Sequence, residues 1–385
     1  MNKIYTLNKI SSKGIKLFGE NYLVQDSLEE ADAILVRSAK MHDMELPVHV
    51  KAIARAGAGV NNIPVESCAE KGIVVFNTPG ANANAVKEIV IAGLLLSSRK
   101  IVEGINWAGT LTENVAKEVE AGKSAFIGPE ILGKKLGVIG LGAIGVMVAN
   151  AAQALGMDVI GYDPYISVDA AWGISRHIHH ALSLEEILTE ADYITIHVPL
   201  TPTTKNMFND EAFAKMKKGV RILNFSRDTL VDNEAVLRAI QEGIVEKYVT
   251  DFPVDGLIGH PNILIIPHLG ASTPESEENC AVMAVKQVKD YLENGNIVNS
   301  VNFPQCEMSW NAAFRLTIIH KNIPAMIGKI TNIIAEEGIN ISDMLNKSKG
   351  EWAYTMIDTD TKVTDQNVQN ILDIDDIINV RVLSK

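Results

Sequence analysis

The sequence predicts an α/β protein with two Rossmann-like, doubly wound lobes and a C-terminal ferredoxin-like domain of βαββαβ order. Three observations predict this fold class. Short apolar runs alternate with helical stretches along most of the 385 residues, which is the spacing of parallel βαβ units. A glycine-rich turn between two apolar runs occupies residues 136–163. From about residue 312 the order changes to strand, helix, strand, strand, helix and strand.

Length, composition and charge limit the protein class. A chain of 385 residues exceeds one ordinary core, so two or three domains are expected. No apolar run approaches the length of a membrane span and the N-terminus lacks the apolar core of a signal peptide, so we expect a soluble, cytoplasmic protein. The three cysteines have no metal spacing and are expected to be reduced thiols. The net charge of −12 argues against nucleic acid or anionic membrane as a partner.

The N-terminal region shows α/β spacing, and its apolar runs end in loops that could present amide donors to an anion. These loops are Arg37-Ser38, Arg55–Gly59 and Asn77–Gly80. Ordinary strand-to-helix turns are the alternative for each loop taken alone. Residues 81–100 then form a strongly apolar helix suited to a crossing between two lobes, and residues 101–125 a more polar helix.

The glycine-rich turn is typical of a dinucleotide site. Gly140 permits a tight turn, Gly142 lets a pyrophosphate approach the backbone, and Gly145 lets helix and strand pack closely. The second apolar run ends at Asp163, 18 residues beyond Gly145. A carboxylate there can accept hydrogen bonds from both ribose hydroxyls and repel a 2′-phosphate, which favours NAD over NADP. A fortuitous glycine turn is the alternative.

Two other patterns are rejected. Gly128–Lys134 matches the first seven positions of a P-loop, but Lys135 replaces the required Ser or Thr and a strand follows. His177, His179 and His180 are clustered, but no carboxylate pattern accompanies them. We therefore predict no metal site.

The strands that follow Asp163 end in polar residues, which we expect to face a common ligand crevice because parallel strands share one carboxyl edge. These ends are His197–Pro199, Asn224–Asp228 and Asp251–Asp255. The apolar run 262–266 then delivers His268 directly into a glycine-bearing loop. A helix over about 274–294 leads back to the first lobe.

The motifs of this chain, and their order along it, resemble those of the D-isomer-specific 2-hydroxyacid dehydrogenase family. The matching segments are VRSA, ARAGAGVNNI, GLGAIG, PLTPTT, NFSR and PHLGAST, and the tail resembles a regulatory module of the ACT type. The resemblance implies a flavodoxin-like substrate-binding lobe at 1–95 and 275–305. It also implies an NAD-binding Rossmann domain at 96–274 and an ACT domain at 312–385.

The resemblance also implies the catalytic residues. His268 would take the hydroxyl proton of a 2-hydroxy acid, and Arg227 would bind the substrate carboxylate and polarise the carbonyl oxygen. A carboxylate should hold the histidine. The family usually carries a Glu in a DVF-x-x-E segment; this chain is one residue shorter there, and Asp255 falls at the Glu position, with a surface turn as the alternative. Asp228 stands where the family commonly has Gly, and either competes for Arg227 or points outward.

Binding residues follow from the same resemblance. NAD contacts are expected from Gly140, Gly142, Ala143, Ile144, Gly145, Asp163, Val198, Pro199, Phe225, Ser226, Asp251, His268 and Gly270. Substrate contacts are expected from Arg37, Ser38, Arg55, Ala58, Gly59 and Asn77. Two of them, Arg37 and Arg55, are the candidates for a substrate phosphate, although each could equally form a surface ion pair.

The tail resembles the serine-sensing module of this family. His320, Asn322 and Asn340 are the candidate effector residues, with Asn340 acting across a subunit interface. Family loops usually have Gly where this chain has Ala325, which would weaken the site if that position needs positive φ. A tail that dimerises without sensing serine is the alternative. We expect a homodimer or a homotetramer.

The implied function is NAD-dependent oxidation of 3-phospho-D-glycerate to 3-phosphooxypyruvate in L-serine biosynthesis, with L-serine as a possible effector. A small anionic substrate is therefore the expected partner, with no nucleic acid and no membrane. One alternative is another D-2-hydroxyacid dehydrogenase, acting on glyoxylate, hydroxypyruvate or 2-hydroxyglutarate. The other is an NAD(H) sensor without turnover, against which Arg227 and His268 speak.

Overall fold

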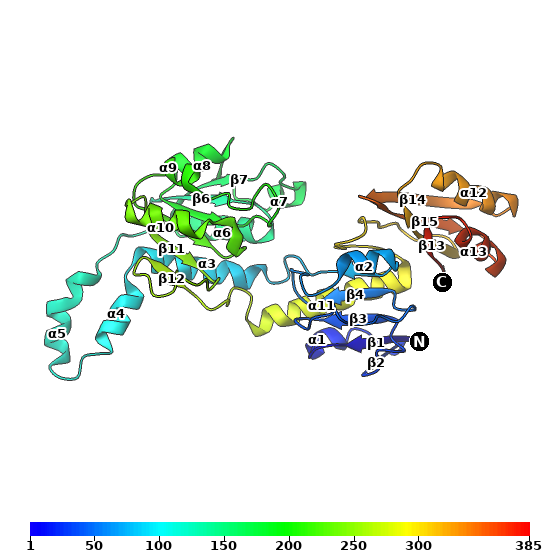
Figure 1. Ribbon diagram of the computed structural model, residues 1–385, viewed down its shortest axis with the longest axis horizontal. Helices are drawn as coiled ribbons and strands as arrows, with labels where there is room; N and C mark the ends of the chain where they lie inside the picture. The colour runs from blue at the N-terminus through cyan, green and yellow to red at the C-terminus, as the bar shows by residue number, and fades with distance from the viewer. The chain divides into compact units, whose positions relative to one another are not determined.

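The computed structural model describes residues 1–385 and contains three sheets of five, seven and four strands (Figure 1). The chain divides into two compact units, Met1–Asn82 with Pro274–Lys385, and Ala83–Thr273. The two larger sheets are parallel and the smallest is antiparallel. The predicted fold class is confirmed. None of the helices combines the length and apolar character needed to cross a bilayer.

The first unit begins with a parallel sheet in the order β2-β1-β3-β4-β5. Strand β3 is an uninterrupted apolar run and β4 is apolar up to Arg55; both are buried on both faces, as expected where helices cover a parallel sheet on each side. The strands are β1 Asn2–Thr6, β2 Tyr22–Gln25, β3 Ala33–Val36, β4 Ala52–Arg55 and β5 Val74–Phe76. The helices are α1 Ser12–Ile15, α2 Val65–Glu70 and the long α11 Pro274–Asn294, which joins the core through Ala284, Val285, Val288 and Tyr291.

The second unit contains the parallel sheet β12-β11-β10-β9-β6-β7-β8. Its strands are β6 Lys135–Ile139, β7 Asp158–Tyr162, β8 His179–His180, β9 Tyr193–Ile196, β10 Val220–Asn224, β11 Val245–Thr250 and β12 Ile263–Ile265. One core contains α3 Ala83–Ser98 and α6 Ala143–Ala154, and the other contains α8 Leu184–Glu190, α9 Asp210–Ala214 and α10 Asn233–Gln241. The short helices α7 Val168–Trp172 and η2 Asp228–Leu230 complete this part.

Helix α3 belongs to the second unit. Its buried side chains Val86, Val90 and Leu94 share a core with Leu136 and Val148 of the glycine-turn region. The border between the two compact units therefore lies before this helix, at Asn82. The domain bounds expected from the sequence, with a border at residue 95, stay a prediction.

A helical hairpin extends from the second unit's sheet (Figure 1). It consists of α4 Ile101–Ala108, α5 Val115–Gly122 and the 3-10 turn η1 Lys123–Phe126, none of which contains a buried residue. Trp107 stacks on Phe126 with ring centroids 5.1 Å apart, so this tryptophan holds the hairpin together.

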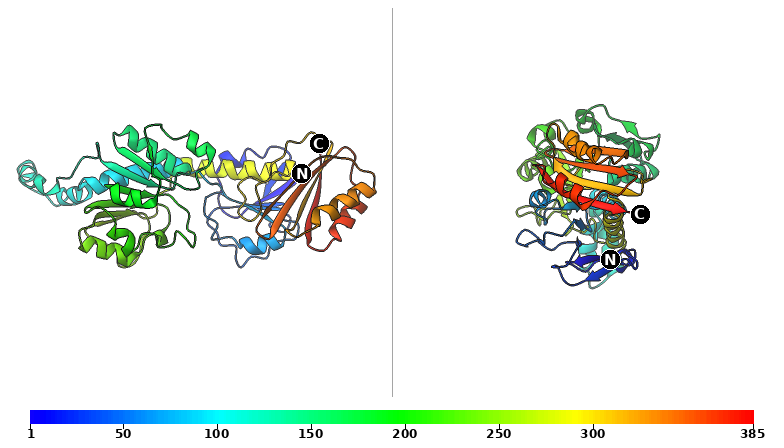
Figure 2. Two further views of the ribbon diagram at one scale, coloured as in Figure 1. Left: turned by 90° about the horizontal axis from the view of Figure 1, so that it is seen from above. Right: turned by 90° about the vertical axis from the view of Figure 1, so that its right-hand side faces the viewer.

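The C-terminal part of the first unit is a ferredoxin-like βαββαβ domain with sheet order β14-β15-β13-β16. Its elements are β13 Phe314–Lys321, α12 Met326–Glu336, β14 Ile341–Lys349, β15 Trp352–Thr359, α13 Asp365–Leu372 and β16 Ile377–Ser384. The two helices cover one face of the sheet (Figure 2). The other face contributes Ile319, Tyr354 and Met356 to the same core as α11, so the domain packs directly on the N-terminal lobe.

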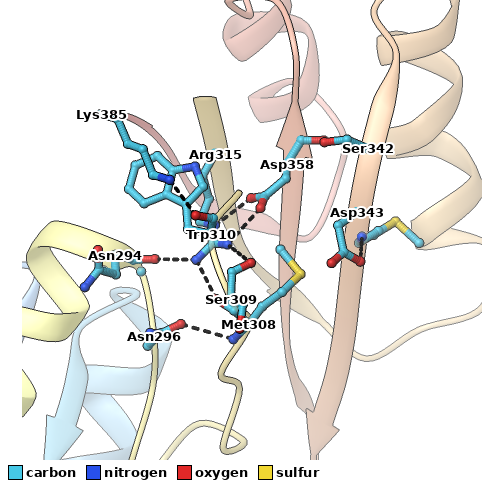
Figure 3. Close-up of polar contacts among 12 residues, drawn as sticks. Asn294, Asn296, Met308, Ser309, Trp310, Arg315, Ser342, Asp343, Asp358 and Lys385 are labelled. Carbon is cyan, nitrogen blue, oxygen red and sulfur yellow. Dashed lines mark hydrogen bonds and ion pairs between the residues drawn. The ribbon is translucent and has the colours of Figure 1, made fainter. Parts of the chain in front are cut away.

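A buried arginine secures this packing (Figure 3). The Arg315 side chain is 0% exposed, and its Nε and Nη2 donate to both carboxylate oxygens of Asp358, at 2.6 and 2.8 Å. Nη1 donates to the Asn294 and Met308 carbonyls at 3.0 Å each, and Nη2 also reaches the Ser309 carbonyl at 3.1 Å. One guanidinium thus joins two strands of the domain to the end of α11 and to the connecting segment, and all five of its N–H donors have an acceptor.

Candidate active site

Three adjacent strands of the second unit bring Arg227, Asp251 and His268 to one edge of the sheet. Strands β10, β11 and β12 are parallel neighbours, with Asn224, Thr250 and Ile265 in register. The three candidate residues follow within three residues of these positions, so they leave the sheet at the same carboxyl edge. Asp251 follows the middle strand and therefore lies between the other two.

His268 lies on a short, well-anchored loop. Its backbone N–H donates to the Asp251 carbonyl at 3.0 Å and to the Ile266 carbonyl at 2.8 Å. The residue has φ 46°, a left-handed conformation that is uncommon outside glycine and often marks a functional constraint. Its exposed imidazole meets the Phe252 ring edge-on, with centroids 5.3 Å apart. The loop therefore presents the imidazole to solvent in a defined place.

Asp251 is 2% exposed and anchors this loop through hydrogen bonds. Its Oδ2 accepts the Gly270 N–H at 3.0 Å, whereas Oδ1 is buried without a hydrogen-bond partner. A Cβ atom at position 270 would lie 2.8 Å from Oδ2, so glycine is needed for this close approach. Burial raises the pKa of the Asp251 carboxyl, while the Gly270 bond and the His268 charge act in the opposite direction.

Arg227 is exposed beyond the end of β10. Its Nη1 donates to the Ser226 carbonyl at 2.6 Å, and its own carbonyl accepts from Asn224 at 2.8 Å. The Asp228 carboxylate accepts the Thr229 N–H at 2.8 Å and forms no ion pair with Arg227. Of the two orientations considered for Asp228, the structure shows the one that leaves the guanidinium available.

The structure does not join Asp255 to His268. Asp255 is exposed in a turn and forms neither a hydrogen bond nor an ion pair. The acidic role expected for it therefore stays a prediction.

The glycine turn has the geometry needed to receive a pyrophosphate. Gly140 adopts φ 90°, and a Cβ there would lie 2.6 Å from the His197 carbonyl oxygen. A Cβ at Gly145 would collide with the Gly140 carbonyl, so strand and helix meet closely there. Nothing lies within 4 Å of the Cβ position of Gly142, at the N-terminus of α6. An anion can therefore approach this open backbone and the helix terminus, with Ala143 and Ile144 beginning the helix.

The neighbouring loops also place the other expected NAD contacts at this edge. Asp163 accepts the Leu141 N–H at 2.8 Å, which sets its carboxylate against the glycine turn. Ser226 Oγ donates to the Val198 carbonyl at 2.9 Å, and Thr204 Oγ1 to the Pro199 carbonyl at 2.7 Å. Phe225 is buried in the core that also contains α3. These residues fit a dinucleotide bound along the edge.

The predicted substrate residues lie in loops of the first unit that hydrogen bonds join to one another. Arg55 Nε donates to the Arg37 carbonyl at 2.9 Å, and its Nη1 to the Gly59 carbonyl. Asn77 Nδ2 donates to the Ala58 carbonyl at 2.6 Å. The Arg55 guanidinium is thus engaged with the backbone of these loops. The Arg37 side chain, 40% exposed, pairs with Glu277 at 2.8 Å.

The sequence reasoning missed Asn8, which follows β1. Its Oδ1 accepts three successive backbone N–H groups, from Arg37, Ser38 and Ala39, at 3.0, 3.1 and 3.1 Å. The Ser38 loop is therefore shaped by a residue 30 positions away in the sequence. In the sequence, the only indication of this role is that Asn8 follows an apolar run, as the other candidate residues at strand ends do.

The structure separates the three candidate effector residues. His320 is buried and contacts the Lys321 carbonyl and Thr355 Oγ1, both at 2.8 Å. Asn322 donates to the carbonyl of Gly350, the residue that follows β14. Asn340, the residue that precedes β14, donates to the Asp360 carboxylate. Strand β14 is nine residues long. At about 3.4 Å per residue the two asparagines are roughly 27 Å apart or more, too far to share a small ligand within one chain.

The comparison with known proteins identifies the family. Residues 92–270 match the family described as "D-isomer specific 2-hydroxyacid dehydrogenase, NAD binding domain". The chain is also 32% identical over 340 residues to D-3-phosphoglycerate dehydrogenase of Haemophilus influenzae, covering 84% of this chain and 79% of that protein. The chain belongs to the D-isomer specific 2-hydroxyacid dehydrogenase family. The matched NAD-binding domain agrees with the cofactor expected from the sequence.

Other members of the D-isomer specific 2-hydroxyacid dehydrogenase family differ in length. The chain is 35% identical over 298 residues to the chloroplastic D-3-phosphoglycerate dehydrogenase 2 of Arabidopsis thaliana, covering 73% of this chain but only 45% of that protein. Among solved structures, NAD⁺-bound 3-phosphoglycerate dehydrogenase of Entamoeba histolytica matches with a TM-score of 0.61 and 27% identity, over 78% of this chain and 98% of that chain. The chain thus spans about half of some curated relatives and most of others.

Proposed function

We propose that this family member is an NAD-dependent D-3-phosphoglycerate dehydrogenase that oxidises 3-phospho-D-glycerate to 3-phosphooxypyruvate, the first step of L-serine biosynthesis. The observation that carries the proposal is the arrangement of Arg227 after β10 and His268 after β12, separated only by β11, at the edge that also bears the open glycine turn. The names of the related proteins support the substrate. A cytoplasmic location fits the three free cysteines.

The residues at this edge have the chemistry that the oxidation of a 2-hydroxy acid needs. Bound NAD would supply the acceptor for the hydride. The Arg227 guanidinium is permanently charged and planar, so it can bind the substrate carboxylate and favour negative charge on the developing carbonyl oxygen. The exposed His268 imidazole can take the hydroxyl proton, because a neutral imidazole has one ring nitrogen that accepts a proton.

A phosphorylated substrate needs a further cation, which we assign to Arg37. Its only ion pair is with a partly exposed carboxylate, Glu277, and such pairs contribute little stability. A substrate phosphate can therefore replace this partner. Arg55 supports the same loop through the Arg37 and Gly59 carbonyls, so its part is to shape the substrate loops.

We further propose a homo-oligomer, a homodimer or a homotetramer, with L-serine bound between ferredoxin-like domains. Strand β14 is an edge strand whose side chains are mostly exposed, and such an edge readily pairs with another strand. Antiparallel pairing of two β14 strands would bring Asn340 of one subunit to the far end of the other subunit's β14, where Asn322 donates to the Gly350 carbonyl. His320, Asn322 and Asn340 could then serve one ligand together, as they cannot within one chain.

The proposed function is tested by steady-state assays with 3-phosphoglycerate, 2-hydroxyglutarate and, in the reducing direction, hydroxypyruvate and glyoxylate. We expect the highest kcat/KM with the phosphorylated substrate and NAD, and inhibition by L-serine. A higher kcat/KM with an unphosphorylated substrate would assign the chain to another branch of the family. No turnover with any of them would favour an NAD(H) sensor. Unchanged turnover in L-serine would favour a tail that only dimerises.

A further inference from the structure

We propose that a cavity between β14 and residues 299–305 of the connecting segment binds a small metabolite that carries phosphate or carboxylate groups, and that this ligand restrains the loop of Asn77. The cavity lies within the first unit, to which both of its walls belong. The inference goes beyond the proposed function, and its test needs no turnover.

Two lysines of β14 supply positive charge to the cavity. Lys347 and Lys349 alternate along the strand and lie opposite Tyr354 and Trp352 of β15. Directly opposite residues of antiparallel strands share one face of the sheet. Tyr354 and Trp352 pack in the core shared with the N-terminal lobe, so the two lysines also lie on that face. Pairing of β14 with a second strand would use its backbone edge and not these side chains.

Neither ammonium group has a carboxylate partner. Lys347 forms no hydrogen bond and no ion pair. Lys349 Nζ donates to the Ser300 and Val301 carbonyls at 3.2 and 2.9 Å, which leaves one of its three N–H groups for a ligand. Although the residue as a whole is exposed, its ammonium group lies against these carbonyls, and this partial burial lowers the pKa of Lys349. A bound anion would stabilise both charges.

The surroundings do not cancel this positive charge. No acidic side chain lines the cavity, although the protein as a whole has a net charge of −12. The carboxylate of Glu351, in the turn after β14, pairs with Lys321 at 3.2 Å. The cavity is therefore a local site of positive charge that favours an anion in an otherwise acidic protein.

The size and the remaining lining fit an organic anion. The cavity has a volume of about 600 Å³, within the range of roughly 300–1,000 Å³ that is common for small-molecule sites. Asn299 and Gln305 add amide groups and Ser348 adds a hydroxyl, which can bind further polar atoms of the ligand. The buried Phe303 and Pro304 line an apolar part that suits a short carbon skeleton.

The connecting segment links this cavity to the predicted substrate loops of the first unit. The Val301 N–H donates to the Val75 carbonyl of β5 at 2.9 Å, and the Asn299 carbonyl accepts the Asn77 N–H at 3.3 Å. Asn77 Nδ2 in turn donates to the Ala58 carbonyl at 2.6 Å. A ligand held between β14 and the segment would therefore restrain the Asn77 loop through backbone hydrogen bonds, a physical connection of the kind that couples two sites.

Isothermal titration calorimetry with inorganic phosphate and with citrate, at constant ionic strength, tests the binding site. Saturating NAD and an Arg37→Ala background keep the glycine turn and the proposed substrate site from contributing. Lys347→Gln should raise the dissociation constant of the tighter probe by about 10-fold or more, because a charge-assisted contact is lost. This lysine has no partner in the structure, so the substitution should not impair folding. Lys362→Gln, at an exposed lysine of the same domain, is the matched control and should bind like the parent.

Hydrogen exchange measured by mass spectrometry tests the coupling in the same Arg37→Ala background. The tighter probe should slow exchange in residues 299–305 and in peptides that contain Asn77. Lys347→Gln should abolish both effects at the same probe concentration, and Lys362→Gln should keep them.

Two results would overturn the proposal. Absence of binding by either probe, or binding that Lys347→Gln leaves unchanged, would contradict the site. Slower exchange in residues 299–305 without any change at Asn77 would contradict the coupling to the substrate loops.

Discussion

At the scale of single residues, the proposed function predicts that Arg37 determines whether a phosphorylated substrate is preferred. Arg37→Ala should raise KM for 3-phosphoglycerate by about 10- to 100-fold, the loss expected for a charge-assisted contact. It should change kcat/KM for an unphosphorylated 2-hydroxy acid by less than about threefold. Glu277→Gln, which removes only the resting partner of Arg37, is the matched control and should not impair the enzyme. Equal losses with both substrates would show that Arg37 only supports the fold.

His197 should make the stability of the protein depend on pH. Burial lowers its pKa to about 3, and its Nδ1 is inaccessible even though part of the residue reaches the surface. Between pH 3 and the unperturbed value of about 6.5, the unfolded chain binds a proton that the folded chain does not. Stability is therefore fully present above pH 6.5 and falls as the pH falls through this window.

Urea unfolding at several pH values measures this effect. Wild type should lose on the order of 2 kcal/mol more free energy of unfolding than His197→Asn between pH 7 and pH 4. The exposed His177→Asn should behave like wild type. Parallel pH profiles for wild type and His197→Asn would show that His197 is protonated in the folded state.

At the scale of secondary structure elements, Ala325 strains the start of α12. It is the N-cap residue and adopts φ 66°, ψ 0°, a left-handed conformation that costs a residue with a Cβ about 1 kcal/mol or more. Ala325→Gly should therefore raise the free energy of unfolding by about 0.5–1 kcal/mol. In Ala335→Gly, inside the same helix, the glycine should instead destabilise by a similar amount. Denaturant unfolding of both variants measures these changes. A lower free energy of unfolding for Ala325→Gly than for Ala335→Gly would contradict this account.

The elements were predictable where a local pattern determines them. The glycine turn, the alternating apolar runs and the βαββαβ tail each follow from neighbouring residues, and the structure contains them. The contacts that complete the candidate site are long-range. Asn8 shapes the Arg37 loop, and the Gly270 N–H meets a carboxylate 19 residues earlier. The local sequence of helix α3 does not indicate which unit it packs into, because its apolar face suits either core.

At the scale of the whole molecule, Arg315 and Asp358 hold the ferredoxin-like domain on the N-terminal lobe. Arg315→Met would leave the Asp358 carboxylate buried and unpaired, at a cost of about 3–5 kcal/mol. The double variant Arg315→Met with Asp358→Leu should recover most of this loss, because no buried charge remains. Arg238→Met, which breaks an exposed ion pair with Asp210, should cost less than about 1 kcal/mol.

Urea unfolding and limited proteolysis of residues 295–312 measure this coupling. The single variant should unfold earlier and be cleaved faster in that segment than wild type. Equal stability of the single and double variants would mean that the carboxylate is solvated in the single variant and that the pair does not hold the domain.

The account as a whole depends on Arg227 and His268 acting together on one bound substrate. Its most direct test is the pre-steady-state rate of NADH formation from 3-phosphoglycerate, measured with NAD saturating in wild type, Arg227→Ala and His268→Gln. We predict a fast wild-type burst or steady rate that falls by about 100-fold or more in each variant, with NAD binding retained. Hydride transfer at the wild-type rate in either variant would contradict the proposed site.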